Sequence, residues 1–347
     1  MKKPNVLVTG GAGFIGVNTC AMLLDRGFDL IVIDNLSRKG TADNLLWLKS
    51  KGKFKFYQAD TRDDKKMVSI FKKHNDLDLV IHLAGQVAVT TSITNPREDF
   101  EINALGTFNV LEAIRKSGSK PLVIYASTNK VYGGMEHIKT VKKKTRYEYR
   151  DYPKGISENV LLDFHSPYGC SKGCADQYVR DYSRIYNIPT VVFRQSCIYG
   201  PRQFGIEDQG WVAWFIIAVI CKKPITIYGD GRQVRDILYV DDLARAYIAA
   251  FENKAKVAGK VINVGGGPKN TMSIWCEFQK ILEDITGEKI EAKYSDWRAG
   301  DQPVYISDIS LAKKLLNWSP KTTPVAGIKK LYDWVSENQD QIKAVLK

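Results

Sequence analysis

The chain has 347 residues, 44% of them hydrophobic and 26% charged, which excludes a disordered or fibrous protein and is typical of a folded globular one. Its formal net charge of +13 comes from lysines and arginines spread along the chain, which favours a solvated basic surface over a nucleic-acid-binding patch. No apolar run is long enough for a transmembrane helix, no signal-peptide pattern opens the chain, and the six cysteines lack metal-binding spacing. We expect a cytoplasmic protein with no metal and no membrane or nucleic-acid partner.

Short apolar runs alternate with helical patterns through the first half of the chain. The runs rich in Val, Ile and Leu are at 5–10, 30–35, 54–60, 77–85, 121–127 and 190–196, and the helical patterns are at 13–26, 44–49, 63–73, 100–116 and from Pro167 onward. Strands that are apolar on both faces and separated by helices are typical of a parallel sheet covered by helices on both sides. The expected fold is therefore α/β, with a doubly wound parallel sheet.

After residue 195 the pattern becomes irregular, with connections rich in Gly, Pro and Arg. We expect one domain built from 1–195 plus about 236–265, in which the run at 261–266 returns to the main sheet. A smaller, discontinuous C-terminal lobe would comprise about 196–235 and 266–347. The apolar run at 211–221 predicts a buried helix in that lobe, because it is too short to cross a bilayer.

The segment TGGAGFIG, residues 9–16, lies between the first expected strand and the first helix. Gly10, Gly13 and Gly16 would let the backbone approach a pyrophosphate at the helix N-terminus, as in Rossmann-type dinucleotide-binding folds. Asp34 ends the next strand, 18 residues after Gly16, where a carboxylate can bind a ribose diol. This carboxylate favours NAD over NADP, although Arg38 nearby leaves room for the phosphorylated form.

The segment SPYGCSKGC, residues 166–174, contains two pairs with a spacing of four, Tyr168 with Lys172 and Cys170 with Cys174. Residues four apart share a helix face, and Pro167 suits a first helical turn, so Tyr168 and Lys172 would point into one site. A phenol titrates near pH ~10 in water, but a neighbouring ammonium and a positively charged nicotinamide both favour the phenolate. Tyr168 would then accept a hydroxyl proton while hydride leaves the same carbon, and the cysteines would be packing residues.

Together with STNKVYG at 127–133, these segments resemble the extended short-chain dehydrogenase/reductase family of nucleotide-sugar epimerases and dehydratases, over nearly the whole chain. The resemblance implies Thr128, Tyr168 and Lys172 as the catalytic trio, with Thr128 hydrogen-bonded to the reacting hydroxyl. Asp60 and Thr61 would either reach the adenine amino group or cap the following helix. The expected NAD contacts are Gly10, Gly13, Phe14, Ile15, Gly16, Asp34, Asn35, Asp60, Thr61, Leu83, Ala84, Gln86, Asn103, Tyr168 and Lys172.

The residues that follow Thr128 favour epimerisation over dehydration. Dehydratases of this family carry Asp and Glu directly after the threonine, since elimination needs a further acid and base, but this chain has Asn129 and Lys130 there. The simplest chemistry is oxidation of one hydroxyl to a ketone, rotation of the keto sugar, and return of the same hydride to its other face. Such an enzyme would hold NAD tightly, because losing the reduced cofactor would strand the intermediate.

Several polar residues are candidates for binding the substrate. Arg235, Arg298 and Asp301 match family positions that bind the substrate diphosphate and nucleotide ribose, with surface salt bridges as the alternative for the arginines. Gln203 and His165 are further candidates that fit a structural role equally well. By resemblance we therefore expect an anionic nucleotide-sugar substrate.

Within the family, the segments at 127–133, 162–173 and 191–204 are most similar to the CDP-sugar 2-epimerases. The sequence Arg194-Gln195-Ser196-Cys197 replaces the more common Arg-Tyr-Phe-Asn, so the usual asparagine contact to the substrate is absent. The resemblance implies inversion at the 2-position of a CDP-linked hexose, either a 3,6-dideoxy sugar or glucose.

Two other functions remain open from the sequence. A UDP-sugar 4-epimerase would use the same catalytic trio, and a non-catalytic NAD-binding regulatory protein would keep the fold without needing Tyr168 or Lys172. By family analogy we expect a homodimer or homotetramer. The lysine-rich insertion at 139–150 would lie over the site or at a subunit contact.

Overall fold

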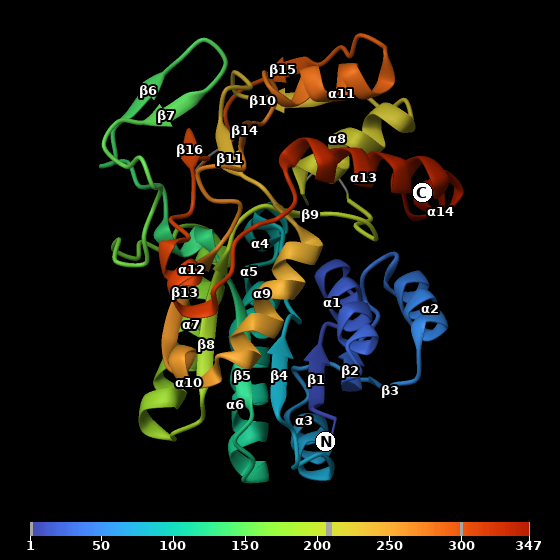
Figure 1. The fold of residues 1–347 in the computed structure, drawn as a ribbon, viewed down its shortest axis with the longest axis vertical. Coiled ribbons are helices and arrows are strands. Elements are labelled where there is room, and N and C mark those ends of the chain that lie inside the picture. The colour runs from blue at the N-terminus through green and yellow to red at the C-terminus, as the bar shows by residue number, and fades with distance from the viewer. Residues whose placement is uncertain (1–2, 206–209, 299–300, 347) are drawn as a thin grey trace.

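The computed structural model describes residues 3–205, 210–298 and 301–346, which form two lobes (Figure 1). In this view the lower lobe holds the main sheet with helices on both faces, and the upper lobe holds short strands and the C-terminal helices. The N-terminus lies at the bottom of the sheet lobe, and the C-terminus lies in the upper lobe.

The main sheet has seven strands in the order β13-β8-β5-β4-β1-β2-β3, and each neighbouring pair is parallel. The strands are β1 (Asn5–Thr9), β2 (Asp29–Asp34), β3 (Lys55–Gln58), β4 (Leu79–His82), β5 (Leu122–Thr128), β8 (Thr190–Gln195) and β13 (Lys260–Val264). This order confirms the predicted doubly wound sheet and the return of the run at 261–266 to it. The chain reverses its direction of winding between β1 and β4, which is where ligands bind in sheets of this kind.

Helices cover the sheet on both faces and form two separate cores. One core contains α1 (Phe14–Asp25), α2 (Thr41–Lys51), α9 (Val240–Glu252), α10 (Lys254–Val257) and α12 (Ser310–Leu316), and the other contains α3 (Asp64–Lys73), α6 (Gly106–Ser117) and α7 (Ser166–Ile185). Side chains alternate along β1, so Val6 and Val8 enter the first core and Leu7 enters the second. Burial on both faces explains why the strands are continuously apolar in sequence.

The helix predicted at 100–116 is interrupted. The chain forms α4 (Val89–Thr94), α5 (Pro96–Phe100) and a π-helical turn, η1 (Glu101–Leu105), before α6 begins at Gly106. The turn places the side chain of Asn103 in the interior, where it contacts Gln86 and Ser171. Gly106 packs so tightly that a Cβ there would lie 2.6 Å from Thr61 Oγ1. Packing toward the sheet edge thus overrides the regular helix that the sequence pattern predicts.

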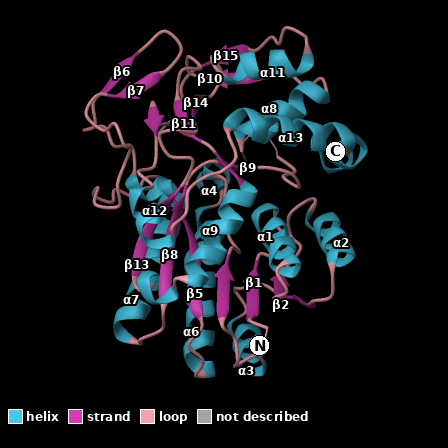
Figure 2. Cartoon of the chain, viewed as in Figure 1, coloured by secondary structure: helices cyan, strands magenta, loops and turns pink. Residues whose placement is uncertain are grey.

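The upper lobe has its own core, built around Trp275 and Phe278. Its elements are β9 (Ile198–Tyr199), α8 (Trp211–Ile220), β10 (Thr226–Tyr228), β11 (Val234–Asp236), β12 (Leu238–Tyr239), β14 (Thr271–Ser273), α11 (Phe278–Thr286), β15 (Lys293–Ser295), β16 (Val304–Tyr305), α13 (Pro324–Glu337) and α14 (Gln339–Leu346) (Figure 2). Helix α8 contributes several buried residues to this core, which confirms the predicted buried helix. Within the described ranges, no helix combines the length and apolar character needed to span a membrane.

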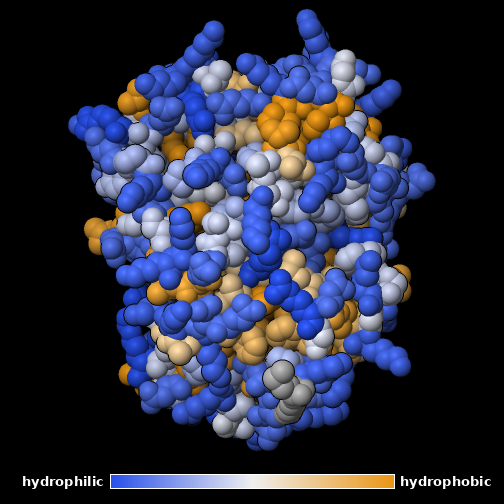
Figure 3. All heavy atoms as spheres, viewed as in Figure 1, coloured by the Kyte–Doolittle hydropathy of each residue, from blue (hydrophilic) through white to orange (hydrophobic). Residues whose placement is uncertain are grey.

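The lysine-rich insertion forms a hairpin of β6 (Thr140–Lys142) and β7 (Tyr147–Tyr149), at the upper left of Figure 1. The hairpin packs on the upper lobe: Tyr147 Oη donates to Asp230 at 2.9 Å, and Arg146 donates to Thr271 Oγ1 at 2.7 Å. Most of the molecular face in Figure 3 is hydrophilic, with apolar side chains in separate patches.

Candidate active site

The glycine-rich segment between β1 and α1 leaves no space for side chains. Gly10 has φ +68, a conformation that favours glycine, and a Cβ on it would lie 2.6 Å from the Ala84 backbone nitrogen. A Cβ on Gly16 would lie 2.1 Å from the Gly10 carbonyl oxygen. Gly13 is the N-cap of α1, and Phe14 and Ile15 form its first turn. The segment therefore presents bare backbone and a helix N-terminus, which fits a pyrophosphate.

Asp34 ends β2 beside this loop and is buried. Its carboxylate accepts hydrogen bonds from the backbone N–H groups of Ala12 at 3.0 Å and Leu36 at 2.8 Å. Burial raises the pKa of Asp34, and the backbone hydrogen bonds oppose this rise. A carboxylate held next to the glycine loop at the end of the second strand fits the predicted role of binding a ribose diol.

Asp60 lies close to Asn35, the residue after Asp34, and does not cap a helix. Asn35 Nδ2 donates to Asp60 at 2.8 Å, and Asp60 forms an ion pair with Arg62 at 2.8 Å. The hydrogen bond from Arg62 lowers the pKa of Asp60 to about 2. Asp63 caps α3 instead, by accepting from the Lys66 N–H. The cap alternative for Asp60 and Thr61 is therefore wrong, and their carboxylate and hydroxyl stay candidates for contacting adenine.

Asn103 joins the end of β4 to the helix α7. Its side-chain oxygen accepts from the Gln86 N–H at 2.9 Å, and its nitrogen donates to Ser171 Oγ at 3.1 Å. Leu83 and Ala84 connect β4 to this segment, and the Leu83 N–H donates to Thr9 O at 3.1 Å. The predicted contacts from β4, the π-helical turn and α7 thus come together on the side of the glycine loop.

The predicted catalytic trio is brought together by β5 and α7. Thr128 is the last residue of β5, whereas Tyr168 and Lys172 lie on the first turns of α7, and their side chains are all buried. The hydroxyl groups of Tyr168 and Thr128 are hydrogen-bonded, and Lys172 Nζ donates to Ala126 O at 2.6 Å. A threonine, a tyrosine and a lysine therefore meet at the carboxyl edge of the sheet.

Burial dominates the electrostatics of this trio. It raises the pKa of Tyr168 to about 12, with the Thr128 hydrogen bond and the charge of Arg38 acting in the opposite direction. Burial also lowers the pKa of Lys172 to about 7, while Asp99 and Asp176 raise it. The protein alone therefore holds Tyr168 as a phenol, contrary to the expected lowering of its pKa by Lys172. Formation of the phenolate needs a further positive charge nearby, such as an oxidised nicotinamide ring.

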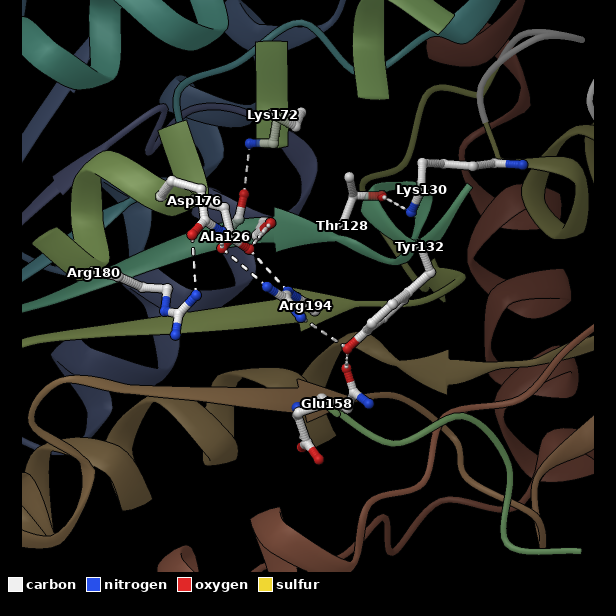
Figure 4. A network of polar contacts seen from close by, with 12 residues as sticks. Ala126, Thr128, Lys130, Tyr132, Glu158, Lys172, Asp176, Arg180 and Arg194 are labelled. Carbon is white, nitrogen blue, oxygen red and sulfur yellow. Dashed lines mark hydrogen bonds and ion pairs between the residues drawn. The ribbon is translucent and has the colours of Figure 1, made fainter. Parts of the chain in front are cut away.

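A buried polar network connects the strand that carries Thr128 to the helix that carries Tyr168 and Lys172 (Figure 4). Arg194 on β8 forms an ion pair with Asp176 on α7, with N–O distances of 2.9 and 3.1 Å, and Ser127 Oγ donates to the same carboxylate at 2.9 Å. Arg194 also donates to Tyr132 Oη at 3.2 Å. The sequence analysis missed this network, although Asp176 follows Lys172 by four residues and so shares its helix face.

In the segment Arg194-Gln195-Ser196-Cys197, the side chains of the first three residues are buried and hydrogen-bonded to other parts of the protein. After Arg194, Gln195 Nε2 donates to Tyr247 Oη at 2.6 Å and Ser196 Oγ donates to Asp236 at 2.7 Å. Burial raises the pKa of the Cys197 thiol. Gln195 thus links β8 to α9 within the sheet lobe, and Ser196 links the end of β8 to β11 of the upper lobe, which gives these two substitutions a structural reason.

The predicted substrate residues do not all come together. Arg235 and Asp301 form an ion pair at 2.6 Å, and Arg235 is buried, so the surface-salt-bridge alternative is wrong for this residue. The guanidinium of Arg298 lies 4.0 Å from the ring centroid of Tyr228, in β10. Gln203 packs against Gly210, where a Cβ would lie 2.3 Å from its Nε2. Arg235 and Asp301 thus form one pair, with Arg298 linked to it through the Asp301 N–H to Arg298 O hydrogen bond of 3.1 Å.

The alternative chemistry at Cys170 and Cys174 has no structural support. Both thiols are free, and the Cys170 Sγ lies 3.9 Å from the Phe164 carbonyl oxygen. Cys170 is exposed, so it is not the packing residue that we expected. His165 precedes α7 and is exposed. In the described parts of the chain, no group of three or more His, Cys, Asp or Glu side chains is arranged to hold a metal ion.

The pattern of the NAD dependent epimerase/dehydratase family matches residues 6–265. The chain belongs to this family. CDP-paratose 2-epimerase of Salmonella typhi is 47% identical over 336 residues, which cover 95% of this chain and 99% of that protein. The structure of UDP-glucose 4-epimerase from Thermotoga maritima with UDP-glucose has a TM-score of 0.83 at 33% identity, covering 96% of this chain and 99% of that one. UDP-glucuronic acid 4-epimerase from Bacillus cereus, in complex with UDP-glucuronic acid and NAD, has a TM-score of 0.82 at 30% identity, with coverage of 96% and 99%.

Membership of the epimerase/dehydratase family identifies the cofactor as NAD, and the residues present fit it. The glycine segment offers a cradle that a Cβ at Gly10 or Gly16 would fill, and Asp34 supplies a carboxylate beside it. Tyr168 and Lys172 lie at the carboxyl ends of the central strands, on the side where nicotinamide must reach a substrate.

Proposed function

We propose that the chain is an NAD-dependent epimerase that inverts the 2-position of a CDP-linked hexose, converting CDP-paratose to CDP-tyvelose, with CDP-glucose as a further substrate. The observation that carries this proposal is the 47% identity, over almost the full length of both chains, to the CDP-paratose 2-epimerase of Salmonella typhi. The meeting of Thr128, Tyr168 and Lys172 supplies the required chemistry.

Binding of the cofactor would be carried by the glycine segment, Asp34, and the contacts around Asp60 and Asn103. When bound, NAD supplies an acceptor for the hydrogen on the sugar carbon and a donor that returns it. Tyr168 accepts the proton of the sugar hydroxyl as that carbon becomes a ketone, and gives the proton back when the alcohol re-forms. Thr128 is hydrogen-bonded to Tyr168, so its hydroxyl positions the same substrate oxygen.

Lys172 would assist this proton transfer from the same helix face. Its ammonium is fixed by the Ala126 carbonyl at 2.6 Å, and once NAD is bound its positive charge would add to that of the nicotinamide in favouring a phenolate. Because burial lowers the pKa of Lys172 to about 7, a small rise in negative charge nearby is enough to keep it protonated at neutral pH. Arg235, Asp301, Arg298 and Gln203 stay proposed substrate contacts, in a lobe formed by about 196–235 and 266–347. The expected bounds of this lobe are wrong for α12, which packs in the core of the sheet lobe.

The test is to incubate the purified protein, without added cofactor, with CDP-paratose and separately with CDP-glucose in heavy water, and to follow the sugar protons by NMR. We expect the 2-epimer with no deuterium at that carbon, because the same hydrogen leaves and returns. A 2-epimer that carries solvent deuterium would mean deprotonation at carbon and would contradict the mechanism.

The second candidate is a UDP-sugar 4-epimerase. It is supported by the fold and by the 33% identity to the Thermotoga maritima enzyme. The same experiment with UDP-glucose and UDP-galactose separates the two: inversion at the 4-position of a UDP-sugar, with both CDP-sugars unchanged, would replace our proposal. A protein that turns over none of these sugars but binds NAD would instead support a regulatory role.

We further propose a homodimer or homotetramer located in the cytoplasm. Large apolar side chains are exposed on neighbouring helices, with Phe100 53%, Tyr178 45% and Ile185 62% exposed, which supports a subunit contact there. All six cysteines are free thiols, as expected for a reducing compartment. Light scattering coupled to size-exclusion chromatography would test the assembly, and a monomeric mass at micromolar concentration would contradict it.

A further inference from the structure

Lys130 is a basic residue next to the catalytic trio that no step above uses. It lies in the 3-10 turn η2 (Asn129–Tyr132), and its backbone N–H donates to Thr128 Oγ1 at 3.2 Å. In Figure 4 its side chain extends away from Lys172 and Asp176. Across residues 3–205, 210–298 and 301–346, no hydrogen bond or ion pair holds its ammonium group.

The surroundings of Lys130 combine burial with a second cation, Arg235. Arg235, Asp301 and Cys197 are its nearest charged or titratable neighbours; burial lowers the pKa of Lys130, and the charge of Arg235 lowers it further. Gln302 connects Arg235 to the turn that carries Lys130. The Gln302 carbonyl accepts from Arg235 at 2.8 Å, and the Gln302 side chain donates to the carbonyl of Gly133, the residue directly after η2. Among the described residues that act electrostatically on Lys130, Asp301 is the carboxylate, and it is already paired with Arg235.

The two cations differ in how many donors they can offer a ligand. Arg235 donates from Nη1 to the carbonyls of Val234 and Gln302, each at 2.8 Å, and from Nη2 to Asp301 at 2.6 Å. Most of its hydrogen-bonding capacity is therefore used within the protein. Lys130 keeps its ammonium donors available, and a partly buried cation without a counterion is favourable only if a ligand supplies one.

We propose that Lys130 binds the phosphate that is attached directly to the sugar, and so selects the carbon that reacts. This inference rests on the proposed 2-epimerase function. The 2-hydroxyl is on the carbon next to the anomeric carbon, so reaction there places the sugar phosphate close to Thr128 and hence to Lys130, two residues later. Reaction at the 4-position would place the same phosphate across the sugar ring from the catalytic hydroxyls.

The experiment measures binding of CDP, CMP and cytidine to the NAD-bound protein by isothermal titration calorimetry, for the wild type and for Lys130→Met. CDP carries the distal phosphate, which would be linked to the sugar in the substrate, whereas CMP lacks it. We expect Lys130→Met to weaken CDP binding at least about tenfold, because a charge-assisted hydrogen bond is lost, and to leave CMP and cytidine unchanged. Lys143→Met, which removes an exposed lysine from the 139–150 insertion, is the matched control and should bind CDP like the wild type.

Two results would overturn the proposal: CDP affinity that is unchanged in Lys130→Met, or equal losses for CDP and CMP. The assay needs no turnover, so its outcome is separate from that of the proposed reaction. If the wild type inverts the 2-position while Lys130→Met keeps full CDP affinity, the function stands and the role of Lys130 is rejected. If CDP binding depends on Lys130 but no CDP-sugar is epimerised, the proposed reaction is what fails.

Discussion

Asp176 and Arg194 form an ion pair in the interior of the protein, with side chains only 0% and 2% exposed. The pair joins α7, which carries Tyr168 and Lys172, to β8, and through Ser127 it reaches the strand that ends at Thr128. Because water does not reach these two charges, each side chain relies on the opposite charge of its partner to offset the cost of burial. The pair therefore holds the catalytic helix and the catalytic strand in one fixed arrangement.

Asp176→Asn should destabilise the protein strongly. Removing one partner of a buried ion pair leaves an uncompensated charge, and we expect the free energy of unfolding to fall by about 3–5 kcal/mol, measured by chemical denaturation. Lys142→Met is the control, because it breaks an exposed pair with Asp230 and should change stability far less. Equal effects of the two substitutions would show that Arg194 finds another partner or solvent in the variant.

Tyr168→Phe should abolish most turnover while keeping NAD bound. Loss of a general acid–base group costs about 10² to 10⁴-fold in rate, and the aromatic ring that packs in the site is retained. Turnover is followed by NMR, and bound NAD by release on denaturation. Cys170→Ser, on the same helix but exposed, should retain full activity. If Cys170→Ser were as impaired as Tyr168→Phe, the tyrosine would lose its assigned role.

Gly16→Ala should damage the cofactor site. The added Cβ would lie 2.1 Å from the Gly10 carbonyl oxygen, so the glycine segment must move, at a cost of about 1–3 kcal/mol. NAD affinity should fall in proportion, as measured by fluorescence titration of NADH. Gly52→Ala provides the comparison, since its Cβ would meet nothing closer than 3.6 Å. Normal NADH binding in Gly16→Ala would place the pyrophosphate elsewhere.

His82 should make the protein sensitive to mild acid. The ring is buried between the hydroxyls of Thr9 at 2.6 Å and Thr107 at 2.9 Å, and burial lowers its pKa to about 3, against roughly 6.5 in an unfolded chain. The unfolded state therefore binds more protons between these values, and stability falls as the pH drops below 6.5.

We expect the free energy of unfolding of the wild type to decrease by about 2 kcal/mol more than that of His82→Gln between pH 7 and pH 5. The difference between the two proteins isolates the histidine, because the carboxylates titrate in both. Parallel pH profiles would contradict the assignment and would mean that water or a rearrangement accommodates the charged ring.

The sheet and the cofactor segment were predictable because their signals are local. The runs of Val, Ile and Leu, the glycines at 10, 13 and 16, and the spacing of Tyr168 and Lys172 each lie within a few residues. The Asp176–Arg194 pair was not predictable in this way. It depends on how α7 packs on β8, the strand that follows it in the chain, and no local pattern marks Arg194 as the partner of Asp176.

The regions outside regular patterns were least predictable. Helices α4 and α5 were not expected, and η1 breaks the helix predicted at 100–116, because contacts of Asn103 and Gly106 with other segments determine their geometry. The surroundings of Lys130 depend on Gln302, which is 172 residues away in sequence. Residues so far apart in sequence come close only in the folded protein, so a local sequence pattern does not predict their contact.

The hairpin β6–β7 has a consequence for building hybrid enzymes. It is encoded between Thr128 and Tyr168, amid the segments of the sheet lobe, yet its side chains bond to Asp230 and Thr271 of the other lobe. Exchanging upper lobes between relatives by cutting the gene after residue 195 would leave this hairpin facing a foreign surface. A working chimaera has to transfer 139–150 with the lobe it packs on, so the donor sequence must be spliced between the two catalytic hydroxyls.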